Sequence, residues 1–186
     1  MTAVSDENAA LLEVLGLTEV PPATLEERIM RIEDREQIRE LVMRYAYLCD
    51  ARQWDDLLDL YTDDIERVLG GTLTEQVRGK EALRALLVAP ALPRKDAGAV
   101  GPPPASKLAT YALRHLVTDE IIRIADDGRT ATAAVAYSLV AVDPADERRG
   151  QHEGAYVFSF RKVDGVWKFS RQVIFSNNAL NPLFRA

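Results

Sequence analysis

The sequence predicts an α+β fold in which helices come first and a curved antiparallel sheet follows and packs against them. Apolar residues recur at steps of three and four in the first half of the chain, as on one face of a helix, whereas the second half reads as successive strands. No internal repeat is visible, and 186 residues suffice for one domain with its own core. We expect residues 1–24 to be an N-terminal extension and residues 25–186 to form the domain.

The first expected element is a long amphipathic helix that ends near Asp50. Thr24 followed by Glu27 fits a capping box, in which each side chain accepts a hydrogen bond from a backbone N–H of the other residue. Apolar residues then follow at helical spacing: Leu25, Ile29, Ile32, Ile38, Leu41, Val42, Tyr45 and Leu48. The macrodipole disfavours an acid at a helix C-terminus, so Asp50 needs a partner, and a histidine would serve.

The rest of the chain divides into two helices, a loop and several strands. Residues 51–64 predict a second, shorter helix, residues 65–71 a strand, and residues 79–89 a third helix. Residues 90–107 are rich in proline and glycine without periodicity, which is typical of a functional lid or of a disordered loop. Turn signals such as "DDGR" and "DG" separate the expected strands of the second half, at 108–125, 130–142, 150–163 and 166–176.

Composition excludes several classes of function. The net charge of −6 and the absence of a basic cluster argue against nucleic-acid or anionic-membrane partners. A single cysteine excludes an internal disulfide and a cysteine-based zinc cluster. Two histidines without a short His/Asp/Glu cluster predict no metal, and we expect no cofactor. No secretory signal or stretch of about 20 apolar residues is present, which favours a soluble, cytoplasmic protein.

Both histidines fall in predicted strands, where side chains alternate between two faces. One face of the 108–125 strand carries Leu113, His115, Val117 and Ile121, and the other carries Arg114, Thr118 and Glu120. The same counting groups His152 with Tyr156, Phe158 and Phe160. Both histidines are therefore expected to face the apolar interior.

An inward histidine has two interpretations. It can be a core residue whose ring bonds a backbone carbonyl, and the aromatic residues around it can be plain core. It can also be an acid–base catalyst, because imidazole titrates near neutral pH. The sequence pattern by itself leaves both open for His115 and for His152.

Several short motifs, in order, resemble SnoaL-like proteins of the nuclear transport factor 2-like superfamily. They are "IEDREQIRELVMRYAYLCDARQWDDLLDLYTDD", "GKEAL", "LRHLVTD" and "VDGVWKFSR", and the resemblance covers about residues 30–176. It implies a conical α+β barrel in which a strongly bent antiparallel sheet wraps around a cavity and the N-terminal helices close its side.

The resemblance also implies a catalytic site. Scytalone dehydratase, bile-acid 7α-dehydratase and hexachlorocyclohexane dehydrochlorinase share an aspartate at the end of the first helix that orients a histidine on an inner strand. By motif, that aspartate is Asp50 and that histidine is His115. Tyr45 matches a tyrosine of the bile-acid enzyme, and His152 approximates a second active-site histidine of scytalone dehydratase.

These features predict a cofactor-independent lyase, a dehydratase or a related eliminating enzyme, for a small hydrophobic substrate that is cyclic or aromatic. We expect the substrate cavity to be lined by Leu113, Val117, Tyr156, Phe158 and Phe160. An isomerase or cyclase, an epoxide hydrolase, a dioxygenase small subunit and a non-catalytic ligand-binding or assembly module are the alternatives. The resemblance further implies a homo-oligomer, a dimer or a trimer.

Overall fold

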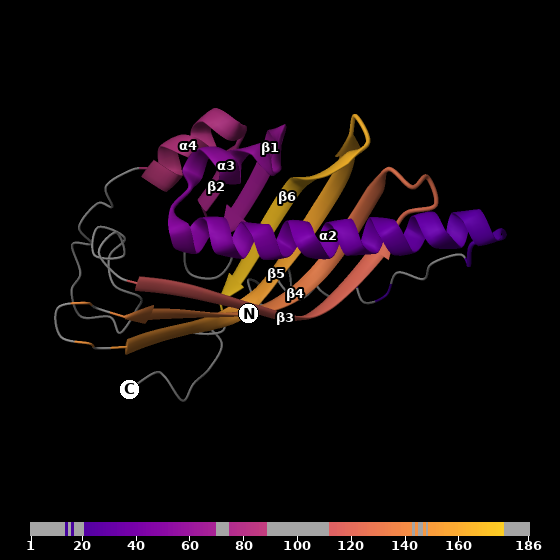
Figure 1. Cartoon of the computed structure of the whole chain (residues 1–186). Coiled ribbons are helices and arrows are strands. Elements are labelled where there is room, and N and C mark those ends of the chain that lie inside the picture. Colours follow the sequence, from indigo (N-terminus) through magenta and orange to yellow (C-terminus); the bar gives the residue numbers. More distant parts are fainter. Residues whose placement is uncertain are drawn as a thin grey trace, which may run out of the picture.

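A six-stranded, strongly curved sheet carries one long helix across its face in the computed structural model of the chain (Figure 1). The structure describes residues 14, 16, 21–69, 75–88, 112–142, 144, 147 and 149–176. The expected lid at 90–107 and most of the expected N-terminal extension lie outside the described residues. The α+β class, with N-terminal helices against a curved sheet, is confirmed.

The long helix α2 spans Leu25–Ala51 and has the expected ends. The Thr24 side chain accepts a hydrogen bond from the Glu27 backbone N–H at 3.1 Å, and the Glu27 carboxylate accepts one from the Thr24 N–H at 3.1 Å. At the other end, Arg52 adopts a left-handed conformation with φ 55°, and its N–H bonds the carbonyls of Cys49 and Leu48. Asp50 therefore lies in the last turn of α2, as predicted.

The elements after α2 are α3 (Trp54–Asp59), β1 (Tyr61–Leu69), β2 (Glu75–Arg78) and α4 (Lys80–Val88). The prediction that the helix after α2 continues through residue 64 was wrong, because residues 61–64 begin β1. Tyr61 pairs with Phe169 of the last strand, so tertiary pairing overrides a locally helical pattern. The short strand β2 was not predicted.

The remaining strands are β3 (Ala112–Ile124), β4 (Thr130–Val142), β5 (Arg149–Val163) and β6 (Val166–Ser176). They pair antiparallel in chain order, so the prediction of one antiparallel sheet over this part of the chain is confirmed. The complete sheet has the order β2-β1-β6-β5-β4-β3 and is mixed, because β1 runs parallel to β6. Across the described strands the sheet is open, with β2 and β3 as its edges.

A β-bulge in β3 reverses its alternation. Asp119 has φ 53°, and the register shifts between Thr118 and Ile121. Ile122 becomes buried in the core with 6% exposure, so the prediction that Ile121 shares the face of His115 was wrong. Glu120, predicted to face outward, instead bonds Arg39 of α2.

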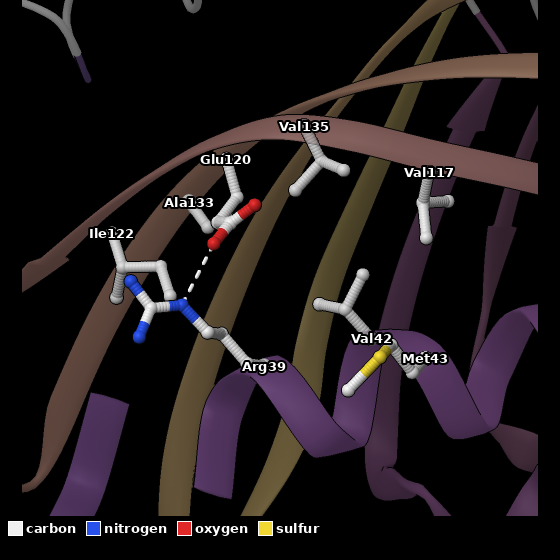
Figure 2. A pocket seen from close by; sticks show the side chains of 8 residues that line it. All are labelled: Arg39, Val42, Met43, Val117, Glu120, Ile122, Ala133 and Val135. Atoms are coloured by element: carbon white, nitrogen blue, oxygen red, sulfur yellow. Dashed lines mark hydrogen bonds and ion pairs between the residues drawn. The ribbon is translucent and has the colours of Figure 1, made fainter. Parts of the chain in front are cut away.

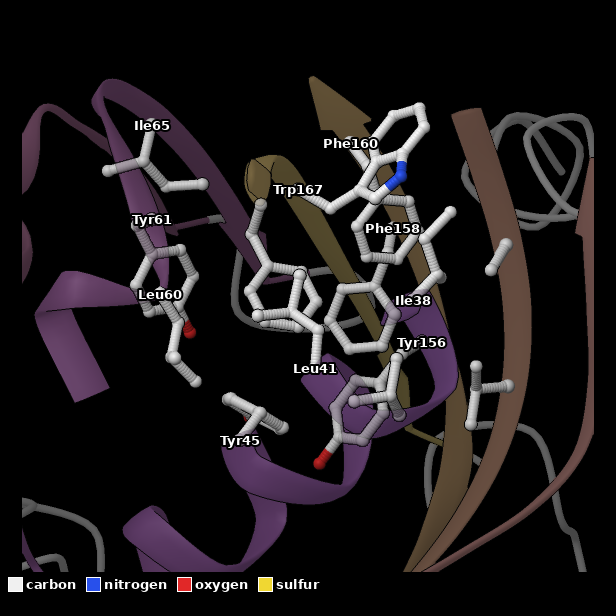
Figure 3. Close-up of a cluster of buried hydrophobic side chains, with 14 of the residues drawn as sticks. Ile38, Leu41, Tyr45, Leu60, Tyr61, Ile65, Tyr156, Phe158, Phe160 and Trp167 are labelled. Atoms are coloured by element: carbon white, nitrogen blue, oxygen red, sulfur yellow. The ribbon is translucent and has the colours of Figure 1, made fainter. Parts of the chain in front are cut away.

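The main core lies between α2 and the concave face of the sheet and is rich in aromatic rings (Figure 3). Tyr45 of α2 makes edge contacts with the rings of Tyr156, Phe158 and Phe169, at centroid distances of 5.7–5.9 Å. A second, smaller cluster lies on the other face and includes Val157. The first cluster fixes α2 over the sheet and thereby sets where its last turn meets β3.

Candidate active site

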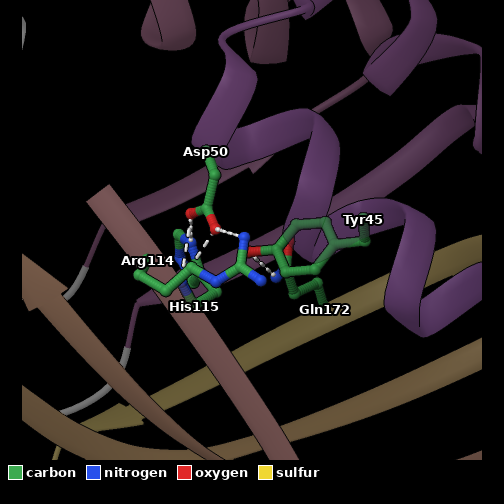
Figure 4. A network of polar contacts seen from close by, with 5 residues as sticks. All are labelled: Tyr45, Asp50, Arg114, His115 and Gln172. Carbon is green, nitrogen blue, oxygen red and sulfur yellow. Dashed lines mark hydrogen bonds and ion pairs between the residues drawn. The ribbon is translucent and has the colours of Figure 1, made fainter. Parts of the chain in front are cut away.

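Asp50 and His115 form the polar centre of the site (Figure 4). Asp50 Oδ1 lies 2.6 Å from His115 Nδ1, and both carboxylate oxygens lie 3.0 Å from the His115 backbone nitrogen. Each side chain is 10% exposed. The Asp50 carboxylate thus contacts both the ring and the backbone of His115. Arg114 Nη1 lies 4.0 Å from Asp50 Oδ2.

The partners of Asp50 determine the tautomer of His115. A carboxylate only accepts hydrogen bonds, so Nδ1 carries the proton that it donates to Asp50. In the neutral ring, Nε2 then keeps its lone pair. Among the described residues, His115 Nε2 has no hydrogen-bond partner. The ring is therefore oriented, with one nitrogen left to accept a proton.

The edge position of β3 explains how Asp50 and Tyr45 both engage the sheet. The two residues are about 140° apart on an ideal helix. Tyr45 points into the aromatic core, whereas Asp50 reaches β3, the edge strand of the described sheet, and takes the His115 N–H. This N–H and the His115 ring offset the unfavourable helix dipole at the α2 C-terminus.

Tyr45 lies beside the Asp50–His115 pair, but its hydroxyl is already engaged. The rings of Tyr45 and His115 meet edge-on at 6.2 Å, and Gln172 Nε2 donates to the Tyr45 hydroxyl at 2.9 Å. Tyr61 donates to the other end of the fully buried Gln172 amide, at 3.3 Å. Burial raises the pKa of Tyr45, so this phenol is neutral near pH 7. A catalytic role for Tyr45 stays a prediction.

His152 lies in the same row of the sheet as His115, two strands away. His115 pairs with Leu139, and Leu139 pairs with His152, so the three side chains share the inner face. The Tyr137 hydroxyl lies 3.1 Å from His152 Nδ1. Burial lowers the pKa of His152. The ring of His152 thus contacts a phenol.

Gly154 makes room for the Tyr137 ring. A Cβ at this position would lie 2.9 Å from Tyr137 Cε1 and 1.8 Å from the Phe175 carbonyl oxygen. The Tyr137 ring stacks on Tyr156 at 4.2 Å, and its hydroxyl donates to the Phe175 carbonyl at 3.3 Å. The glycine thus allows a tyrosine to lie flat beside the inward histidine.

A pocket of about 110 Å³ opens between α2, β3 and β4 (Figure 2). Its lining consists of Arg39, Val42, Met43, Val117, Glu120, Ile122, Ala133 and Val135. Arg39 Nε donates to Glu120 at 2.7 Å across it. Neither Asp50 nor His115 lines this pocket, although Val117 lies two residues from His115 on the same face.

The predicted substrate-lining residues fall into two groups. Val117 lines the pocket, and Leu113 is half-buried on the face of His115. Tyr156, Phe158 and Phe160 are buried to 3% exposure or less within the aromatic core. Contact of these five residues with a substrate stays a prediction.

Sequence reasoning missed Gln172, Tyr137 and Arg67, which all lie on the inner face. Gln172 is buried three residues after the buried Phe169, because a bulge breaks the alternation of β6. Tyr137 was part of a predicted strand, and the alternation of β4 was a signal that could have identified it. Arg67 shares the face of the buried Ile65 and pairs in register with Gln172.

A family model that describes the SnoaL-like domain matches residues 30–173. The chain belongs to the SnoaL-like family. A search of the curated proteins finds no match. In this SnoaL-like protein, the predicted acid–base pair is Asp50 in the last turn of α2 and His115 in β3.

Solved structures share the fold at low sequence identity. An NTF2-like protein with a cystatin-like fold from Novosphingobium aromaticivorans is 22% identical, with a TM-score of 0.66 over 90% of this chain and 97% of that one. A putative scytalone dehydratase from the same organism is 17% identical, with a TM-score of 0.63 over 80% and 87%. A type 2 hexachlorocyclohexane dehydrochlorinase is 18% identical, with a TM-score of 0.61 over 81% and 89%.

Metal-binding clusters and membrane-spanning helices are both absent from the described residues. No three His, Cys, Asp or Glu side chains among them come together as a metal site would require. Within the same residues, no helix is both long and apolar enough to cross a membrane.

Proposed function

We propose that this SnoaL-like protein is a cofactor-independent lyase that eliminates water or another leaving group from a small hydrophobic, cyclic or aromatic substrate. The observation that carries the proposal is that Asp50 contacts His115 at two places, the ring nitrogen Nδ1 and the backbone N–H. A histidine that only filled the core would need one carbonyl partner, and no buried carboxylate. Fold neighbours that include a putative scytalone dehydratase and a dehydrochlorinase support the same reaction type.

In this proposal each member of the pair has its own role. His115 Nε2 accepts a proton from a substrate carbon, the electron pair of that C–H bond forms the new C=C bond, and the leaving group departs from the neighbouring carbon. Asp50 stabilises the imidazolium and stays ionised itself. When the leaving group is hydroxide, the imidazolium returns the proton to it, so that water is released and His115 is neutral again.

The experiment uses a panel of cyclic ketones that carry a β-hydroxyl or a β-halogen, since loss of either group creates a conjugated enone with a strong ultraviolet band. The expected result is enone formation by the wild-type protein and loss of this activity in His115→Gln. Asp34→Asn serves as the control, because Asp34 is also a buried carboxylate of α2 but contacts Lys162 and Trp167.

A second readout separates proton abstraction from elimination. Analogues without a leaving group, followed by NMR in D₂O, should exchange their α-protons in a way that requires His115. Exchange together with isomerised product and no elimination would favour the isomerase alternative. Absence of both exchange and elimination across the panel would contradict the proposal and favour a binding module.

A further inference from the structure

Two adjacent residues of β1 have opposite surroundings. Glu66 lies on the outer face, where its carboxylate pairs with Arg78 at 3.1 Å and with Arg171 at 3.2 Å. Arg67 lies on the inner face, next in register to Gln172. Among the described residues, the Arg67 guanidinium has neither an ion-pair partner nor a side-chain hydrogen bond.

Among the described residues, the groups with the largest electrostatic influence on Arg67 carry no charge near pH 7. Its main electrostatic neighbours are Tyr45, Tyr61, Cys49 and Tyr156. Burial raises the pKa of Cys49 to about 12 and raises the pKa values of the three tyrosines, so all four are neutral. The guanidinium stays protonated, because an arginine does not lose its proton in the physiological range.

An unpaired charge inside a protein is costly and needs an explanation. Proteins pair buried charges or use them, because desolvation without a partner destabilises the fold. Arg67 is only half-buried, so it is enclosed by protein and still keeps part of its surface accessible. Since no described residue accepts from it, the guanidinium has donors that suit a planar, two-oxygen anion.

We propose that Arg67 anchors a carboxylate group of the substrate, which makes the substrate a small apolar carboxylic acid. This inference rests on the proposed function in placing the substrate beside the Asp50–His115 pair. Tyr45 links the two places, because its ring lies 6.2 Å from the His115 ring and its hydroxyl binds Gln172, the register neighbour of Arg67. In this proposal, an acid held by Arg67 extends its apolar part toward His115.

The binding test compares benzoate with benzyl alcohol, which has a similar shape and no charge, by calorimetry and thermal shift. Wild-type protein should bind benzoate with a dissociation constant of roughly millimolar and bind benzyl alcohol about tenfold more weakly or not at all. Arg67→Met should lose the preference. Arg78→Met, which removes the same charge from the outer face, should keep it.

His115→Gln distinguishes this inference from the proposed function. It should bind benzoate as the wild type does, even where elimination is lost, since the anchor and the base are separate residues. Equal binding of benzoate by Arg67→Met, equal binding of the two probes by the wild type, or no benzoate binding at all would overturn the inference.

The stability of the empty protein gives an independent readout. If Arg67 is kept for a ligand, Arg67→Met should raise the melting temperature or leave it unchanged, because it removes a partly buried charge that no described residue pairs. A structural arginine would behave in the opposite way, and a clear fall in melting temperature for both Arg67→Met and Arg67→Lys would overturn the inference.

Discussion

The long helix α2 carries two carboxylates that are buried to nearly the same extent but have different partners. Asp34, in its first half, has a side chain that is 11% exposed, and Asp50, in its last turn, has one that is 10% exposed. Asp34 accepts hydrogen bonds from Lys162 Nζ at 2.6 Å and Trp167 Nε1 at 2.8 Å. Asp50 accepts from the ring and backbone of His115.

The two carboxylates differ in whether their partner has a further atom that can accept a proton. An ammonium group and an indole N–H only donate hydrogen bonds, so the Asp34 contacts tie α2 to β5 and β6 and leave no acceptor for a proton. The ring of His115 has a second nitrogen beyond the one that Asp50 holds. Burial of a carboxylate is thus common to both regions, and the partner decides whether the contact is structural or suited to proton transfer.

The largest expected effect is that of His115→Gln. Turnover should fall by about 10²–10⁴-fold, the usual contribution of a positioned acid–base group, because the glutamine amide cannot take the proton. Steady-state kinetics on a panel substrate measures this, and circular dichroism checks the fold. Near-normal turnover by the folded His115→Gln variant would contradict the distinction between Asp50 and Asp34.

Asp50→Asn should lower turnover by about 10²-fold. The asparagine oxygen can still accept the His115 backbone N–H, but its amide can donate to Nδ1 and so move the ring proton to Nε2. The loss should appear in kcat more than in KM, since the pocket is unchanged. A variant with lost binding and unchanged kcat would assign Asp50 to structure, like Asp34.

Asp34→Asn tests the other carboxylate and should act on stability. Removing one partner of a partly buried ion pair should lower the free energy of unfolding by about 3 kcal/mol, because Lys162 is left without its counter-charge. Denaturant unfolding measures this loss. Turnover of the folded fraction should stay within about twofold of the wild type. A large loss of turnover without loss of stability would contradict the comparison.

The smallest expected effect concerns His152, the inward histidine whose Nδ1 lies beside the Tyr137 hydroxyl. Burial lowers its pKa, so the folded state resists a proton that the unfolded state accepts. The stability contributed by neutral His152 is therefore complete above the ordinary histidine pKa of about 6.5 and is lost as the pH falls below it.

His152→Gln should reduce the fall in melting temperature between about pH 7.5 and about pH 5. Gln151→Ala, on the outer face of the same strand, should leave that fall unchanged. A steeper fall in His152→Gln than in the wild type would mean that the folded state prefers the protonated ring, contrary to the expected direction.

The sequence was sufficient wherever an element is regular. The capping box at Thr24 and Glu27 located the start of α2, and the alternation in β3 put His115 on the inner face, because β3 has no irregularity before Thr118. Asp50 was found because an acid at a helix end calls for a partner. Its distance to His115 depends on packing between distant segments, and the resemblance supplied that pairing.

Irregular pairing explains what the sequence did not reveal. The bulge after Thr118 turned Glu120 toward α2, and the shift in β6 turned Gln172 inward with Phe169. Arg67 lies within the strand predicted at 65–71, but the face it occupies depends on parallel pairing with β6. Neither bulges nor parallel pairing leave a periodic signal in the chain.

The central claim is that Asp50 holds His115 with the proton on Nδ1 and the lone pair on Nε2. Long-range ¹H–¹⁵N NMR at about pH 8 reads the tautomer of a neutral histidine directly. The chain has only two histidines, so the spectrum of His115→Gln assigns both. The account predicts the Nδ1–H form for His115 in the wild type and its loss in Asp50→Asn. An Nε2–H form in the wild type, or a tautomer that Asp50→Asn leaves unchanged, would contradict it.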